Sequence, residues 1–460
     1  MEIFDGRLID AVNRKDLKEY LLNCNFGLEK ENIRVDENGR LAETPHPEIF
    51  GNRLKNPYIK TDFSESQIEI ATPVCHTLKD VYDSLENIHD TVCLNIGDEY
   101  LWPQSNPPYL PKEDEIPIAN MGDEYEDKFR AVLAVKYGRK RQVISGIHYN
   151  FSFNEAFINS IYNEFANEEN FMGFKNKLYL KICRNFMKYR WLLIYMTGAS
   201  PVFHNTFIKK YVDESCSLDD GTCYYKNMIS LRNSDYGYKN RNNFYIPFNS
   251  VESYVCEINR LADSKELQDI CEFYGPVRLK TGNDDDLSRE LIEKGIQYIE
   301  IRILDLNPLY KIGISKDILY FIHIFVLYML FKDDQAYDIQ NHFTAEKNVQ
   351  IISFRGRQDD LLLYDDNGCR VSFKAKALCI LDSMFEMLKL LHMDSEYFSE
   401  LIEAAKDMVE HPSKTFSGRI FEKVKEESYI GFHMEKAIEY LNESKKSQIA
   451  KAANLITYKI

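Results

Sequence analysis

The chain has 460 residues, of which 44% are hydrophobic and 28% are charged, and it contains 30 Tyr and 28 Phe. This composition excludes disordered and fibrous proteins and predicts a globular protein with a large core. The formal net charge of -15 disfavours broad contact with nucleic acid or an anionic membrane, because phosphate groups would be repelled wherever a local basic patch is lacking. An anionic small substrate would need divalent metal ions or a few well-placed arginines.

Targeting signals and cysteine usage indicate where the protein works. The N-terminal segment has early acidic residues and no apolar core segment, so we expect no secretion signal and a cytoplasmic location. The longest apolar run, 318–331, is interrupted by His323 and is too short to span a bilayer. The ten cysteines form no C-x-x-C pair, which favours a reducing compartment over a disulfide framework.

The hydrophobic patterns predict strands in the first part of the chain and helices in the last. The predicted strands are 25–36, 61–74, 144–153, 276–280 and 298–304, and a polar loop over 281–288 separates the last two. The predicted helices are 1–22, 78–98, 124–137, 154–196, 251–265, 315–332, 374–393, 396–410 and 430–456, with a loop-rich stretch over 203–250. This order predicts an α+β fold with helices on one side of an antiparallel sheet.

The length fits about three average domains or one elaborated sheet-based domain. We expect a single domain over 1–460. Its catalytic part, 1–312, would bear most of the sheet, and 313–460 would be mainly helical.

Metal ligands and anion binders recur on four predicted strand segments. Residues i and i+2 of a strand share a face, so each segment can point such groups into one cleft. Five converging carboxylates without a metal ion would repel one another and hold protons at neutral pH. Oxygen-rich ligand sets with one imidazole suit Mg²⁺ or Mn²⁺. The segments carry Glu29 and Glu31, Asp62 and Glu69, His148 and Asn150, and Glu300 and Arg302.

Each of these groups also has a purely structural interpretation. The acids around Glu29 could be solvated on an edge strand, and His148 could be a hydrogen-bonded core histidine. Arg302 could form a salt bridge with Glu300, or stabilise phosphoryl oxygens in a magnesium site. Arg232 lies in a polar loop, where it could be solvated or could bind a substrate carboxylate.

Two other sources of chemistry are weaker. Cys75 and His76 are adjacent, and neighbouring strand residues point to opposite faces, so they make a poor nucleophile and base pair. The basic run 136–141 is interpreted as a solvated turn, and neither common Gly-rich phosphate loop is present in the sequence. If ATP is used, metal ions and strand-borne side chains must hold it.

Several long motifs, in one order over residues 25 to 420, resemble glutamate-cysteine ligase of the bacterial type, which also forms the N-terminal module of bifunctional glutathione synthetases. They include GLEKENIRV, NPYIKTDFSESQIEIATPV, LWPQSNPP, ISGIHYNFS, SLRNSDYGY, YIEIRILDLNP and TFSGRI. The resemblance implies a glutamine-synthetase-like fold. In that fold a curved antiparallel sheet forms a funnel that holds ATP, two or three Mg²⁺ ions and L-glutamate.

The resemblance also implies roles for individual residues. The implied metal ligands are Glu29, Glu31, Asp62, Glu69, His148 and Glu300. Arg302 would steady the transferred phosphoryl group, and Arg130 would lie close to it. Substrate binding is assigned to Arg232, for a carboxylate, to Asn150, and to the cysteine-pocket residues Phe63, Phe129, Leu133, Gln142 and Tyr238.

The implied reaction moves the ATP γ-phosphoryl group onto the γ-carboxylate of L-glutamate. The amine of L-cysteine then attacks, giving γ-glutamylcysteine, ADP and phosphate, which is the first step of glutathione biosynthesis. The sequence ends before a second ATP-using module, so we expect the dipeptide product. Phe129 stands where relatives often carry tyrosine, which leaves a ligase with another small amine acceptor as the alternative. An inactive binding scaffold is a remote third, because a scaffold has no reason to keep mutually repelling acids.

Overall fold

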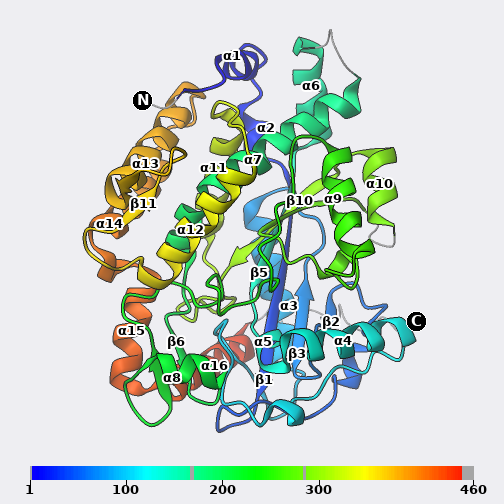
Figure 1. Cartoon of the computed structure of the whole chain (residues 1–460), viewed down its shortest axis with the longest axis vertical. Helices are drawn as coiled ribbons and strands as arrows, with labels where there is room; N and C mark the ends of the chain where they lie inside the picture. The colour runs from blue at the N-terminus through cyan, green and yellow to red at the C-terminus, as the bar shows by residue number, and fades with distance from the viewer. Residues whose placement is uncertain (1–2, 166–169, 283–285, 448–460) are drawn as a thin grey trace.

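The computed structural model describes residues 3–165, 170–282 and 286–447. Its centre is a seven-stranded sheet in the order β2-β3-β1-β5-β10-β9, with β4 also paired to β1, and each of these pairs is antiparallel (Figure 1). The strands are β1 (Asn25–Val35), β2 (Ile59–Thr61), β3 (Gln67–Ala71), β4 (Tyr100–Leu101), β5 (Ile147–Ser152), β9 (Val277–Lys280) and β10 (Tyr298–Leu304).

The two faces of the sheet differ because side chains alternate along each strand. On one face, Leu28, Tyr149 and Ile301 are buried in the largest apolar cluster. Helices α3 (Leu78–Cys93), α7 (Phe171–Thr197) and α11 (Lys316–Phe331) supply much of the rest of that cluster, and α3 and α7 contact the sheet directly. The intervening strand residues, such as Glu29 and His148, face the other way, so the polar groups share one side.

The C-terminal part is a helical layer beside this core. Helix α7 packs against both α11 and α12, and the three lie side by side in Figure 1. Helix α11 is apolar around nearly its whole circumference, as expected for a helix surrounded by protein. The layer contains α12 (Ile339–Arg355), α13 (Phe373–Leu390), α14 (Glu396–Glu410), α15 (Phe416–Glu427) and α16 (Tyr429–Lys446), with the short strands β11 (Leu362–Tyr364) and β12 (Arg370–Ser372).

A second apolar cluster forms around the buried Trp102, near the end of β1. Residues from α4 (Glu124–Tyr137), α15 and α16 join it, as do residues of β6 (Val202–His204) and β8 (Thr222–Tyr224), which form a small sheet with β7 (Cys216–Ser217). The remaining helices are α1 (Gly6–Arg14), α2 (Lys18–Leu22), α5 (Arg139–Gln142), α6 (Glu155–Phe165), α8 (Lys209–Glu214), α9 (Val251–Asp263) and α10 (Leu287–Lys294).

The α+β class, the antiparallel sheet, the helices on one of its faces and the helical C-terminal region are confirmed. The funnel shape stays a prediction. In the described part of the chain, no helix is both long enough and apolar enough to cross a membrane. Residues 1–2, 166–169, 283–285 and 448–456 of the predicted elements lie outside the described residues.

Other predictions were wrong in detail. The segment 61–74 is not one strand. It holds the last residue of β2, a turn and then β3, and the turn closes through the Gln67 N–H to Ser64 carbonyl bond of 2.8 Å. The loop predicted over 281–288 includes the start of α10, whose first turn is capped by Asp286. Helices α12 and α15 were not predicted. The run 136–141 is not a solvated turn, since its Lys and Arg side chains hydrogen-bond to protein atoms.

Candidate active site

Three predicted metal ligands meet on the polar face of the sheet. Glu29 on β1, His148 on β5 and Glu300 on β10 each offer a ligand atom, and these atoms lie within 4.8 Å of one another. His148 Nδ1 is 2.9 Å from Glu29 Oε2 and 3.7 Å from Glu300 Oε1. Three separate stretches of sequence therefore form one cluster.

The pairing of the strands explains this convergence. In the β1–β5 ladder Glu29 lies opposite His148, and in the β5–β10 ladder Glu300 lies opposite Asn150. The Asn150 amide donates to Glu29 Oε1 at 2.9 Å. Because β1 lies between β3 and β5, the edge-strand interpretation of its acids is wrong.

The local charges set the protonation of this cluster. Burial is the largest single influence on Glu29 and Glu300 and raises the pKa of both. The hydrogen bonds and charge of His148 and Asn150 at Glu29, and the charges of Arg302 and His148 at Glu300, together outweigh burial, so each pKa is lowered. Burial and the charge of Arg302 lower the pKa of His148. At neutral pH the cluster therefore offers two carboxylates and a neutral imidazole, the forms that bind metal ions.

Three further acids lie beside this cluster. Glu31 on β1 is the direct ladder partner of Glu69 on β3, and Asp62 lies in the turn just after β2. Burial raises the pKa of Glu31 well above its usual range, and the charge of Asp62 adds to the effect. Burial and the charges of Glu29 and Asp62 raise the pKa of Glu69 to about 7, and burial also raises the pKa of Asp62. This is the repulsion expected where cations are needed to balance the acids.

The polar atoms of the cluster fit a divalent cation. His148 Nε2 and Glu300 Oε2 are among the buried atoms that make no hydrogen bond to the described residues, although His148 Nε2 lies 3.5 Å from Glu31 Oε1 and Glu300 Oε2 lies 3.9 Å from Arg278 Nη1. Buried polar atoms rarely lack a hydrogen bond, so these two have lone pairs free to bind a metal ion. The carboxylate-rich set with one imidazole suits a hard ion such as Mg²⁺ or Mn²⁺.

Two arginines border the acids. Arg302 on β10 donates to Glu300 Oε1 at 2.9 Å, so the salt bridge of its structural interpretation is present, and its Nη1 also lies 3.4 Å from His148 Nδ1. Arg232 is only 6% exposed, so its solvated interpretation is wrong. Its Nη1 donates to the Arg302 carbonyl at 2.7 Å.

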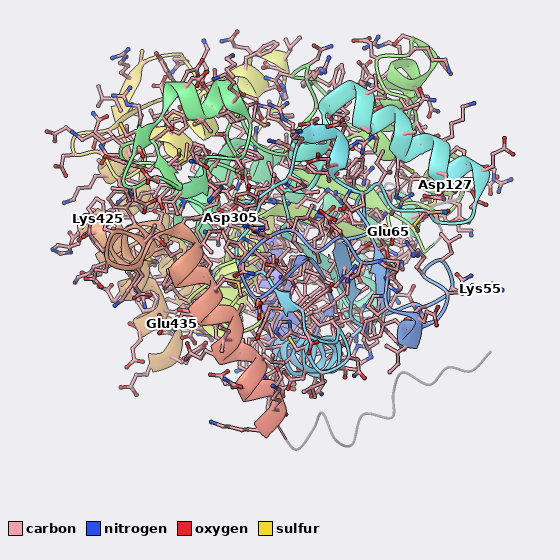
Figure 2. All side chains as sticks on the ribbon, turned by 90° about the horizontal axis from the view of Figure 1, so that it is seen from below. Lys55, Glu65, Asp127, Asp305, Lys425 and Glu435 are labelled. Carbon is pink, nitrogen blue, oxygen red and sulfur yellow. The ribbon has the colours of Figure 1, made fainter. Side chains whose placement is uncertain are left out.

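A buried carboxylate fixes the loop that carries Arg232. Asp305, which Figure 2 labels among the packed side chains, is 3% exposed. It accepts hydrogen bonds from the Ser230 hydroxyl at 3.0 Å, the Asn233 amide at 3.3 Å and the Ala199 N–H at 2.8 Å. These bonds attach the residues on both sides of Arg232 to the chain just after β10.

The predicted acceptor-pocket residues gather on the Asp62 side of the acids. Arg130 on α4 donates from Nε to the Asp62 carbonyl at 2.8 Å and pairs with Glu126. The second apolar cluster includes buried Phe63 and Leu133, with Phe129 and Tyr238 packed against it. Gln142, in α5, is also buried.

Sequence reasoning missed three residues of this region. The Tyr274 ring centroid lies 4.4 Å from that of Tyr238, and both tyrosines line a cavity of about 100 Å³ together with Arg232 and Arg302. Tyr274 stands in a loop with no periodic signal. Arg278 and Lys280 on β9 were detectable, because they alternate with the buried Val277 and Leu279; Arg278 lies opposite Glu300.

Comparisons with known proteins identify the family of the chain. The sequence model of the Glutamate-cysteine ligase family matches residues 9–266 and 261–352. The chain is 46% identical over 456 residues to the glutathione biosynthesis bifunctional protein of Clostridium perfringens, covering 99% of this chain and 58% of that protein. The corresponding protein of Streptococcus mutans is 37% identical, with 92% of this chain and 52% of that protein covered. The chain thus spans little more than half of these curated relatives.

Solved structures agree with the sequence relatives. The bifunctional glutathione synthetase of Pasteurella multocida matches with a TM-score of 0.83 and 30% identity, over 94% of this chain and 54% of that chain. The glutamate-cysteine ligase of Francisella tularensis, solved in complex with AMP, matches with a TM-score of 0.86 and 25% identity, over 95% of both chains. The chain therefore belongs to the glutamate-cysteine ligase family.

Proposed function

We propose that this chain joins the γ-carboxylate of L-glutamate to the amine of L-cysteine at the expense of ATP, giving γ-glutamylcysteine. Family membership supports the reaction class, and the cluster of Glu29, His148 and Glu300 within 4.8 Å is the observation that carries the proposal. The AMP bound to the Francisella relative supports a nucleotide substrate. A cytoplasmic location, where ATP and reduced cysteine are both present, fits this reaction.

The acids on the sheet would hold Mg²⁺, as two or three ions. Bound Mg²⁺ neutralises charge on the ATP phosphates and on the group being transferred. The two buried atoms that make no hydrogen bond in the described part of the chain, His148 Nε2 and Glu300 Oε2, support this assignment. The proposed ligands are Glu29, Glu31, Asp62, Glu69, His148 and Glu300.

The first chemical step is a phosphoryl transfer. A γ-carboxylate oxygen of glutamate attacks the γ-phosphorus of ATP, the bond to the β–γ bridging oxygen breaks, and γ-glutamyl phosphate and ADP result. Phosphoryl transfer depends on positioning and on charge stabilisation more than on covalent help from the protein. Arg302, held by Glu300, stabilises the transferred phosphoryl group. Arg130, which donates to the Asp62 carbonyl, lies close to that phosphoryl group. Asn150, which donates to Glu29, and Arg232 bind substrate.

The second step forms the amide bond. The cysteine amine attacks the acyl carbon, the carbon–oxygen bond to phosphate breaks, and phosphate and a proton are released. Cysteine would be bound in the pocket of Phe63, Phe129, Leu133, Gln142 and Tyr238. Phe129 has no hydroxyl that could hydrogen-bond to the amine substrate. Hydrogen bonding at this position therefore does not select among small amines.

The decisive experiment supplies purified protein with glutamate, cysteine, ATP and Mg²⁺ and identifies the product by mass. Formation of γ-glutamylcysteine with equimolar ADP supports the proposal. Parallel reactions with 2-aminobutyrate, serine and ammonia test the alternative acceptor. If one of these amines has a higher kcat/KM than cysteine, that amine is the preferred acceptor. If no ADP forms with any of the four amines, the proposal is wrong.

A further inference from the structure

Gly146, the residue before β5, contacts the acidic cluster through its backbone. Its N–H donates to Glu31 Oε2 at 2.9 Å, and its carbonyl accepts from the Glu31 N–H at 3.0 Å. One residue thus holds both the main chain and the carboxylate of Glu31. Any displacement of the Gly146 backbone would move this acid.

The other side of Gly146 is filled by Arg232. A Cβ atom built on Gly146 would overlap the Cζ, Nη2 and Nε atoms of the Arg232 guanidinium. The backbone φ of Gly146 lies outside the left-handed region, so the need for glycine here comes from this close approach and not from backbone conformation.

Arg232 has little freedom to move away. Its Nη1 is bonded to the Arg302 carbonyl at 2.7 Å, and the loop on both sides of it is attached to Asp305 through Ser230 and Asn233. Its own carbonyl lies so close to Gly237 that a Cβ on that glycine would overlap it. The arginine is therefore fixed at both its backbone and its guanidinium.

We propose that Gly146 is a positioning residue for the ligase reaction. Its missing side chain lets the Arg232 guanidinium lie against the backbone that holds Glu31, which fixes the substrate-binding arginine relative to the metal-binding acid. This inference rests on the proposed function, because that function assigns substrate binding to Arg232 and metal binding to Glu31.

The kinetic test uses Gly146→Ala, Arg232→Lys and the double variant. We expect Gly146→Ala to raise the KM of glutamate or cysteine about tenfold, the size of one lost charged hydrogen bond, while the KM of ATP changes less than about threefold. The double variant should bind no worse than Arg232→Lys, because contacting residues are non-additive. Gly6→Ala is the control, since nothing lies within 4 Å of the Cβ it would add. An unchanged KM in Gly146→Ala, or effects that multiply in the double variant, would overturn the proposal.

A second test does not depend on activity. Gly146→Ala should lower the melting temperature, and combining it with Arg232→Ala should recover most of that loss, because the new methyl group then has room. A double variant that melts as low as Gly146→Ala would refute the steric coupling, even if wild type makes the dipeptide. If wild type forms no dipeptide but the melting temperature recovers, the proposed function fails and the packing of Gly146 on Arg232 stands, without its positioning role.

Discussion

Glu29 and Glu300 stand on strands that do not pair with each other, yet both carboxylates approach the same nitrogen of His148. The distances to Nδ1 are 2.9 Å from Glu29 and 3.7 Å from Glu300, because β5, which carries His148, lies between β1 and β10. Both carboxylates therefore interact with the same imidazole and influence each other's charge. Removing the charge of either one changes the surroundings of the other.

Neutralising either acid should stop catalysis without unfolding the protein. We expect Glu29→Gln and Glu300→Gln each to reduce ADP release to background, because losing one ligand weakens metal binding more than it weakens the core. A coupled ADP assay measures the rate, and circular dichroism checks the fold. The control is Glu410→Gln, at an exposed position, which should retain wild-type turnover. Near-normal turnover in either test variant would contradict the metal assignment.

Magnesium binding should strengthen as the pH rises. The pKa of Glu69 is raised to about 7, so at pH 6 a metal ion must displace a proton that is largely gone at pH 8. For one such proton, the apparent Kd of Mg²⁺ should fall about tenfold between pH 6 and pH 8. Isothermal titration calorimetry at both pH values measures the change.

The same pKa gives the sign of a stability effect. The folded state keeps the Glu69 proton up to about pH 7, whereas the unfolded carboxyl loses it near its ordinary pKa of 4.5, so the metal-free protein loses stability as pH rises through this window. Glu69→Gln should remove this contribution and flatten the pH dependence of Mg²⁺ binding. A wild-type Kd that is constant from pH 6 to pH 8 would be inconsistent with a displaced proton.

A buried carboxylate near the cavity of Tyr238 and Tyr274 should control the KM of cysteine, because Tyr238 belongs to the proposed cysteine pocket. Glu272 is fully buried, pairs with Lys136, and accepts hydrogen bonds from the Tyr137 hydroxyl and the Gln268 N–H. Asn240 connects this network to the cavity. Its amide donates to the Tyr137 hydroxyl at 3.0 Å and to the Glu272 carbonyl at 2.8 Å, and its Oδ1 accepts from the Tyr274 N–H at 2.8 Å, so the network fixes one wall of the cavity.

We expect Glu272→Gln to raise the KM of cysteine several-fold and to lower the free energy of unfolding by about 2 kcal/mol, since Lys136 loses its charged partner. The KM of ATP should stay near its wild-type value. Glu293→Gln, at an exposed position on α10, serves as the control. Equal increases in the KM of all three substrates would indicate that the whole site is less ordered, and not that only this wall of the cavity has changed.

Acid should destabilise the protein through His323. This residue of α11 is fully buried beneath the sheet, where its Nε2 lies 2.6 Å from the Leu21 carbonyl, and burial lowers its pKa to about 4. The unfolded histidine takes up a proton below pH 6.5 and the folded one does not, so stability is lost as pH falls from 6.5 to 4. By pH 5 this one group removes roughly 2 kcal/mol.

Urea unfolding at pH 7 and pH 5 measures the loss. His323→Gln should be less stable than wild type at pH 7, but should lose less stability on going to pH 5. The exposed His392 has a φ of 54°, which asparagine tolerates, so His392→Asn is the matched control and should keep the wild-type difference. A pH dependence unchanged by His323→Gln would show that other groups cause the acid sensitivity.

The alternation of side chains along a strand was enough to predict part of the site from the sequence. Glu29 with Glu31, His148 with Asn150, and Glu300 with Arg302 follow the two-residue period of a strand, and in each pair both residues do face the acidic cluster or its border. The residues between them, Tyr149 and Ile301, lie in the core on the opposite face, as this period requires. A strand's own geometry decides these positions, whatever its partners are.

Only the tertiary structure decided which segments meet. Asp62 and Glu69 are an odd number of residues apart, so one continuous strand would have put them on opposite faces, and the hairpin between β2 and β3 brings them to the same side. Tyr274 joins the cavity from a loop, and Gly146 matters because the guanidinium of a residue far along the chain lies against it. Such contacts depend on strand order and on close packing between distant segments, and no periodic pattern in the sequence records either.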